Sequence, residues 1–232
     1  MNSRLLILFL LVLTVGECKR GAGISREEYS PVQSARGICN SDFDLNDTIK
    51  NKLSSENSDE AGKASTAILQ LAEKSSGCRT EIVKALMHAM NQRDLDFIED
   101  KRSYRLWSAG AAILGELKAV ESLDLLIAHL DENDGHYSAS MVHQPAIHGV
   151  KAMGAEAVPK LSEAMRRSSN RNIRLAAALC LFDIGGQDAT EALKQALKTE
   201  SDSCVRRFIE LNFQPATEEV LKQRVFAFRC GN

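Results

Sequence analysis

Residues 173–206 read IRLAAALCLFDIGGQDATEALKQALKTESDSCVR, and this stretch decides the fold. It opens on Ile173-Arg174 and returns to the same kind of pair, Val205-Arg206, after 32 residues. Between the two pairs lie an Ala- and Leu-rich segment, a Gly-Gly step and a second segment whose apolar residues recur every three or four positions. This spacing places apolar side chains on one face of a helix. The stretch therefore predicts two helices joined by a tight turn, followed by the start of a third.

The template of the second helix occurs four times along the chain. Each copy has apolar residues at offsets 0, 3, 6 and 7, and His129 and Thr190 are its imperfect positions. The copies begin at Val83, Leu123, Val158 and Thr190, which are 40, 35 and 32 residues apart. Two-helix units that recur at about 30 to 40 residues are typical of α-solenoids. The sequence predicts an all-α fold, a short α-solenoid of about four helical hairpins.

Glycines punctuate three of the expected hairpins. The motifs AAILGEL, VKAMGAE and FDIGGQD end three first helices at Gly115, Gly154 and Gly185. Glycine just past a helix end adopts the left-handed conformation without a steric penalty. We expect all three glycines to take this conformation.

Arginines occur at matching places at the start of the first helices, at Arg105, Arg174 and Arg206. One interpretation is a row of guanidinium groups that binds an anion. The other is that each arginine pairs with a neighbouring carboxylate or helix end, with Asp183 and Asp202 as expected partners. Sequence alone favours the second interpretation.

The repeated stretch resembles a HEAT repeat of the short bacterial type, which also occurs in phycobilin lyases. The resemblance rests on the Val/Ile-Arg opening, the Ala-rich first helix, the Ile-Gly turn and the A-x-x-A-L-x-x-A-L second helix. It covers residues 104–213 well and residues 60–92 loosely. The resemblance implies stacked hairpins whose second helices line a concave surface. A repeat fold says little about function, because function depends on the site that the fold carries.

The first residues, MNSRLLILFLLVLTVGECKR, have the features of an export signal. Arg4 precedes an apolar run of eleven residues, Leu5 to Val15, and charged residues follow. A membrane-spanning helix needs roughly twenty apolar residues, so this run fits a signal peptide that is cut after Gly16. We expect a signal peptide at 1–16, a polar, loosely ordered segment at 17–57 with a short helix near 44–53, and the solenoid at 58–232. The mature protein would then be secreted or periplasmic.

Export permits disulfides, and the chain has six cysteines. The candidate pairs are Cys39 with Cys78, at the N-terminal segment, and Cys204 with Cys230, at the C-terminal tail. Sequence does not choose among the fifteen connectivities that six cysteines allow. Cys180 lies in an apolar helix and is expected to be a buried thiol.

The sequence Val-Gly-Glu-Cys at 15–18 resembles the lipobox of bacterial lipoproteins. Lipoboxes have a small residue directly before the acylated cysteine, and here that residue is Glu17. Membrane attachment is therefore expected only if Cys18 is lipidated, which the departure from the motif argues against.

The loop sequence DENDGHYSASMVHQPAIH at 131–148 is the best candidate for chemistry. Its carboxylates and imidazoles are the groups that bind zinc or another divalent ion. The spacing of Asp131, Asn133 and Gly135 breaks the EF-hand pattern, and a polar loop between helices explains the residues equally. The candidate metal ligands are Asp131, Asp134, His136 and His143.

No catalytic motif accompanies the repeats. The sequence has no G-x-S-x-G, no phosphate-binding loop and no His-Glu dipeptide, and Trp107 is expected to serve packing. A net charge of −2 without a basic block argues against nucleic acid. We therefore expect a non-catalytic scaffold without a cofactor, which binds a protein or peptide. The alternative is an enzyme or enzyme accessory, either metal-dependent through the 131–148 loop or similar to chromophore lyases, whose work is cytoplasmic. The resemblance places these candidate partner-binding residues on the second helices: Lys84, His88, Asp124, Lys160, Glu163, Arg167, Lys194 and Lys198.

Overall fold

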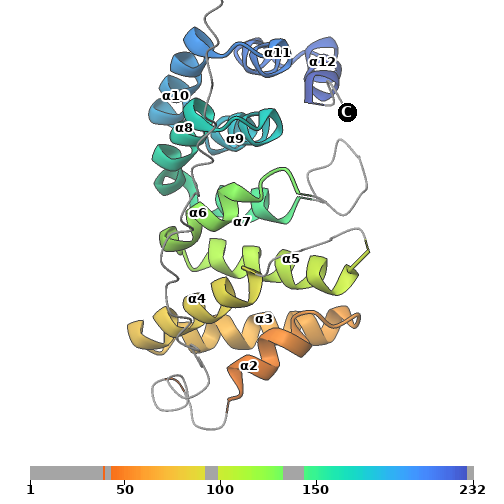
Figure 1. Cartoon of the computed structure of the whole chain (residues 1–232), viewed down its shortest axis with the longest axis vertical. Coiled ribbons are helices and arrows are strands. Elements are labelled where there is room, and N and C mark those ends of the chain that lie inside the picture. The colour runs from red at the N-terminus through yellow and green to blue at the C-terminus, as the bar shows by residue number, and fades with distance from the viewer. Residues whose placement is uncertain (1–38, 40–42, 92–98, 133–143, 229–232) are drawn as a thin grey trace, which may run out of the picture. The chain divides into compact units, whose positions relative to one another are not determined.

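The computed structural model describes residues 39, 43–91, 99–132 and 144–228, and side chains up to residue 223. Within these ranges the chain forms helices and no β-strand (Figure 1). No helix in the described ranges combines the length and the apolarity that a membrane span requires. The elements are, in order, Leu45–Asp47 (α2), Thr48–Lys52 (η1), Ser58–Glu73 (α3), Ser76–Met90 (α4), Lys101–Glu116 (α5), Val120–Ser122 (η2), Leu123–Ala128 (α6), Pro145–Met153 (α7), Gly154–Ala157 (η4), Val158–Arg167 (α8), Arg171–Ile184 (α9), Gly186–Thr199 (α10), Ser203–Asn212 (α11) and Glu218–Phe228 (α12).

The helices stack in two layers. In the first layer α5 packs against α7, α7 against α9, and α9 against α11. In the second layer α6 packs against α8 and α8 against α10, and the two series run side by side in Figure 1. The layers are joined where α8 contacts α9 and α10 contacts α11. Each unit thus buries its apolar side against its neighbours in sequence order, and the predicted all-α repeat solenoid is confirmed.

The apolar template of the second helices faces the core. Leu123, Leu126 and Leu130 are almost fully buried, and their counterparts in α4 and α8 are buried as well. The two imperfect positions, His129 and Thr190, are only partly buried. The periodicity therefore located both the helices and their buried faces.

Polar residues directly before the helices fix where they begin. The side chains of Asn57, Ser75, Asp100, Asn170 and Asp202 each accept a hydrogen bond from a backbone N–H in the first turn of α3, α4, α5, α9 and α11, respectively. The first N–H groups of a helix have no partner within the helix, so these caps stabilise the helix starts.

The glycine prediction holds at two positions and is wrong at the third. Gly154 and Gly185 have φ of +69° and +67° and end α7 and α9. Gly115 instead lies within α5, and the left-handed residue after that helix is Lys118, with φ of +50°. A Cβ on Gly115 would lie 2.7 Å from the carbonyl oxygen of Gly149. Gly115 is therefore small because α5 and α7 approach closely, not because the chain turns there.

The end of the segment expected to be loosely ordered belongs to the core. Leu45, Ile49 and Leu53 are buried, at four-residue intervals that place them on one face of α2 and η1. The short helix expected near 44–53 is present. The predicted signal peptide at 1–16 and residues 17–38 lie outside the described residues, and the domain boundaries remain predictions.

Candidate partner-binding face

We call the solvent side of α6, α8 and α10 the second-helix face. These helices contact one another in sequence order, so their exposed side chains form one continuous surface. Asp124, Lys160, Lys194 and Lys198 are exposed on it, and Glu163 is partly exposed. Lys84 and His88 are exposed on α4. The structure thus places most of the predicted binding residues on one layer, and their role in partner binding remains a prediction.

The charges of α6 and α8 are paired across and along the helices. Lys160 Nζ lies 2.7 Å from Asp124 Oδ1, so this ion pair bridges two neighbouring repeats. The hydrogen bond and the charge of Asp124 raise the pKa of Lys160. Arg167 Nη1 lies 2.8 Å from Glu163 Oε1, one helical turn away. Surface pairs of this kind contribute little to stability, but they set a pattern of alternating charge.

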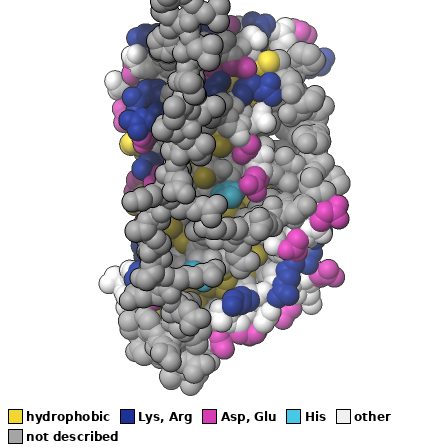
Figure 2. Space-filling model, in the orientation of Figure 1, with side chains coloured by type: hydrophobic (Ala, Val, Ile, Leu, Met, Phe, Trp, Pro, Cys, Tyr) yellow, Lys and Arg dark blue, Asp and Glu magenta, His cyan; other side chains and the backbone are white. Residues whose placement is uncertain are grey.

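The charged side chains of α10 and α4 also have local partners. Lys198 Nζ donates to Gln195 Oε1 at 2.9 Å, and Gln195 Nε2 donates to Glu191 Oε1 at 2.6 Å. On α4, Lys84 Nζ lies 3.2 Å from Glu81 Oε1. Figure 2 shows basic and acidic side chains next to one another along the edge formed by α8 and α10. The surface has no uniform sign.

A groove of about 580 Å³ runs between α8 and α10. Its walls combine apolar side chains with charged ones at the rim. The sequence patterns did not predict this groove, because two helices from different repeats build it. The lining residues are Ala155, Val158, Pro159, Ser162, Met165, Arg166, Asp188, Glu191, Ala192, Gln195, Ala196 and Thr199.

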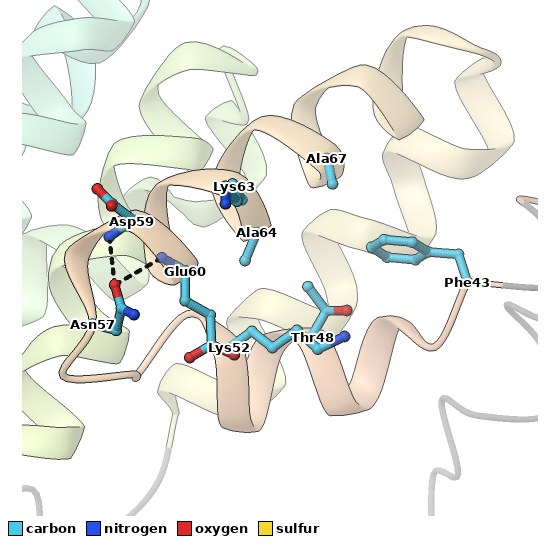
Figure 3. A pocket seen from close by; sticks show the side chains of 9 residues that line it. All are labelled: Phe43, Thr48, Lys52, Asn57, Asp59, Glu60, Lys63, Ala64 and Ala67. Atoms are coloured by element: carbon cyan, nitrogen blue, oxygen red, sulfur yellow. Dashed lines mark hydrogen bonds between the residues drawn. The ribbon is translucent and has the colours of Figure 1, made fainter.

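A second hollow, of about 610 Å³, lies between η1 and α3 (Figure 3). Phe43 closes one end, and Lys52 and Glu60 extend along it. Asn57 at its other end is occupied as a helix cap, because its Oδ1 accepts from the backbone N–H groups of Asp59 and Glu60. Both charge signs line this hollow, so no single ligand class is indicated.

The matching arginines serve the chain itself. Arg105 donates to the Ser54 carbonyl, after η1, and Arg206 to the Leu197 carbonyl, at the end of α10. Arg174 donates to the Ser168 carbonyl and forms an ion pair with Glu200. These contacts support the structural interpretation, in which arginines cover the carboxyl ends of the preceding helices.

The expected partners of these arginines were wrong in part. Asp183 pairs instead with Lys151, at 2.5 Å, whereas the charge of Asp202, the cap of α11, does act on Arg174 and helps to raise its pKa. Before α7 the arginine position falls on His143, which lies outside the described residues, or on Gln144, whose Oε1 is buried and has no hydrogen-bond partner among the described residues. The carboxylate that forms the ion pair with Arg174 belongs to Glu200, 26 residues away in sequence. The spacing of residues within one helix could not predict this pair.

The candidate metal loop is only partly described. Asp131 Oδ2 accepts a hydrogen bond of 2.7 Å from Asn170 Nδ2, which ties the start of the loop to the cap of α9. Asp134, His136 and His143 lie outside the described residues. Among the residues that the structure describes, no three histidine, cysteine, aspartate or glutamate side chains are grouped as metal ligands.

The single tryptophan is part of the core, as expected. Trp107 is fully buried and its indole N–H donates to the Met90 carbonyl at 3.0 Å. The His129 ring lies 4.6 Å from the Trp107 ring, centroid to centroid, and His129 Nδ1 is 2.8 Å from Glu132 Oε1. The imperfect repeat position thus holds an aromatic contact in place of an aliphatic one.

The cysteines divide into distinct environments. Cys204 is disulfide-bonded, and its partner, like Cys230, lies outside the described residues. Cys180 is a fully buried thiol, and burial raises its pKa to about 12. Cys39 and Cys78 are neighbouring thiols, and the disulfide expected between them remains a prediction.

Comparison with known proteins agrees with the helical architecture. The family model of HEAT repeats matches residues 138–212, which span the part of the chain from before α7 to the end of α11. HEAT repeats generally mediate protein–protein interactions, because stacked hairpins present an extended surface. A search of curated proteins finds no significant match. We conclude that residues 138–212 of this chain match the HEAT-repeat family, in agreement with the stacked helical hairpins.

Proposed function

We propose that the protein is an exported, non-catalytic HEAT scaffold that binds a protein or peptide partner on its second-helix face. The observation that carries the proposal is the continuity of α6, α8 and α10, whose exposed side chains and the α8–α10 groove form one surface. Export is supported by the apolar run at 5–15 behind Arg4.

The charge pattern indicates the kind of partner. Lys160 and Asp124 form an ion pair across repeats, while Asp188 and Lys194 lie exposed on α10. A polyanion or polycation would meet repulsion on such a surface, whereas a polypeptide of mixed charge would find complementary groups. The exposed apolar side chains Ala155 and Pro159 in the groove would add contacts with an apolar residue of the partner.

A crosslinking experiment tests the binding face. The full chain and a Lys160→Glu/Lys198→Glu variant are used as baits against extracellular proteins from the native source, and crosslinked residues are mapped by mass spectrometry. Lys63→Glu, on exposed α3, is the control for charge reversal. We expect crosslinks to α8 and α10 that fall at least tenfold in the double variant and persist in the control. If only Lys63→Glu abolished the crosslinks, the partner would instead bind at the hollow between η1 and α3, and the proposal would be contradicted.

Export has a separate test. Mass spectrometry of the secreted or periplasmic fraction should find a mature chain that begins at Glu17. An intact N-terminus in the cytosolic fraction alone would contradict export without affecting the binding face.

A further inference from the structure

The side chains of Cys39 and Cys78 meet at the junction of the N-terminal segment with the first hairpin. Cys78 lies in the first turn of α4 and is 1% exposed, and Cys39 packs against the same core from the chain that leads into α2. The two sulfur-bearing side chains are hydrogen-bonded to each other. Proximity of the two side chains is the first geometric condition for a disulfide between them.

We propose that Cys39 and Cys78 form a disulfide in the exported protein, which fastens the segment before α2 to α4. This inference rests on the proposed export, because structural disulfides persist in oxidising compartments. The oxidant is a second disulfide, carried by a thiol–disulfide oxidoreductase or by oxidised glutathione. One thiolate attacks it to form a mixed disulfide, and the second cysteine then displaces the carrier. The two cysteines lose two electrons and two protons, and the carrier is released as two thiols.

The environment of the pair indicates when the bond forms. Burial, the contact with Cys78 and the nearby charge of Glu81 raise the pKa of Cys39 to about 12, so Cys39 is almost entirely a thiol at neutral pH, and Cys78 is 1% exposed, which hinders the approach of a carrier. Only the thiolate attacks a disulfide. Oxidation is therefore expected while the chain folds, before α4 buries Cys78, and only slowly afterwards.

The other described cysteines do not compete for this pairing. Cys180 is fully buried within α9, and Cys204 is already disulfide-bonded. The proposed bond closes a loop that contains α2, η1 and α3, so it restricts the unfolded chain over a substantial length. α2 and η1 pack against α3 and α4, and Arg102 of α5 donates to the Lys50 carbonyl, so the bond would add a covalent link to a segment that these helices already hold.

Peptide mapping of the full chain tests the pairing. The denatured, reduced protein is refolded in a glutathione redox buffer, alkylated and digested with trypsin without reduction. Cleavage after Arg36, Lys50, Lys74 and Arg79 gives peptides 37–50 and 75–79, which contain Cys39 and Cys78. We expect one linked species that separates on reduction. It should be absent from Cys39→Ser and Cys78→Ser, and present in Cys180→Ser, the control for loss of a cysteine outside the pair.

Thermal unfolding gives a second readout. The oxidised protein is expected to melt on the order of 10 °C above Cys39→Ser, and the difference should vanish when the wild type is reduced. Alkylation of both peptides in the oxidised sample, or linkage of Cys39 to a different cysteine, would overturn the inference. Linkage after refolding, with both thiols alkylated in protein taken directly from cells, would instead overturn export and leave the pairing standing.

Discussion

Arg174 and Glu200 form two parallel hydrogen bonds, from Nε to Oε2 at 2.8 Å and from Nη2 to Oε1 at 3.0 Å. The Glu200 side chain is 4% exposed and that of Arg174 is 14% exposed, so the pair is almost removed from water. Arg174 also donates to the Ser168 carbonyl after α8, and Glu200 accepts from the Asp202 N–H before α11. One ion pair therefore connects the ends of three successive helical units.

Removal of one partner of this pair should destabilise the solenoid strongly. The hydrogen bond and charge of Glu200 raise the pKa of Arg174, so the arginine stays charged at every accessible pH. In Glu200→Ala the guanidinium is left buried without its counter-charge, and we expect a loss of about 3 kcal/mol in the free energy of unfolding, measured by urea denaturation.

Two variants serve as controls for this prediction. Arg174→Met/Glu200→Leu removes both charges and should cost less than either single change. Glu163→Ala breaks an exposed pair on α8 and should change stability by no more than about 0.5 kcal/mol. Equal losses for Glu200→Ala and Glu163→Ala would show that burial of the pair is unimportant.

The crossing of α5 and α7 depends on Gly149. A Cβ at this position would lie 2.5 Å from the Ala111 carbonyl oxygen and 3.2 Å from a Leu126 methyl group. Because the first obstacle is backbone, the helices must separate to admit a methyl group. We expect Gly149→Ala to lower the free energy of unfolding by about 2 kcal/mol, although alanine is the better helix former.

Gly62→Ala is the matched control for that change. Gly62 lies within α3, and nothing approaches a Cβ there within 4 Å. The substitution should raise the free energy of unfolding by up to about 1 kcal/mol. Circular dichroism in urea distinguishes the two variants by the sign of the change. A stabilising Gly149→Ala would mean that α5 and α7 do not cross this closely.

The structure also shows which features the sequence patterns could predict and which they could not. The periodicity at Val83, Leu123 and Val158 predicted the second helices and their buried faces, since burial of one face repeats with the helical turn. Sequence reasoning misassigned Gly115 on its glycine motif, because a glycine that permits close packing and a glycine that ends a helix look alike in one sequence. It also missed Glu200 and the α8–α10 groove, because both depend on residues from different repeats that only stacking brings together.

The hydrogen bond from Trp107 to Met90 joins α5 to the end of α4. In Trp107→Phe the Met90 carbonyl would be left buried without its donor, and part of the space filled by the indole would be empty. We expect a loss of about 2 kcal/mol in the free energy of unfolding. Phe213→Leu, at an exposed aromatic residue, should change it by less than about 0.5 kcal/mol. Circular dichroism is the measurement, because Trp107 is the only tryptophan.

Protonation of Asp100, the cap of α5, should make the stability of the protein depend on pH in the acidic range. Asp100 accepts hydrogen bonds from the Ser103 hydroxyl and from the backbone N–H groups of Ser103 and Arg102, and these bonds lower the pKa of the Asp100 carboxyl. Because the pKa of Asp100 in the folded protein lies below its unfolded value of about 3.9, the ionised cap stabilises the fold fully above that pH, and this stabilisation is lost as the pH falls through the folded pKa.

Asparagine caps helices as well as aspartate but does not titrate. The melting temperature of Asp100→Asn should therefore fall less steeply than that of the wild type between about pH 5 and pH 2. Ser103→Ala, which removes the main cause of the pKa shift, should give an intermediate slope, and identical profiles for all three proteins would refute the assignment of Asp100 as a titrating cap.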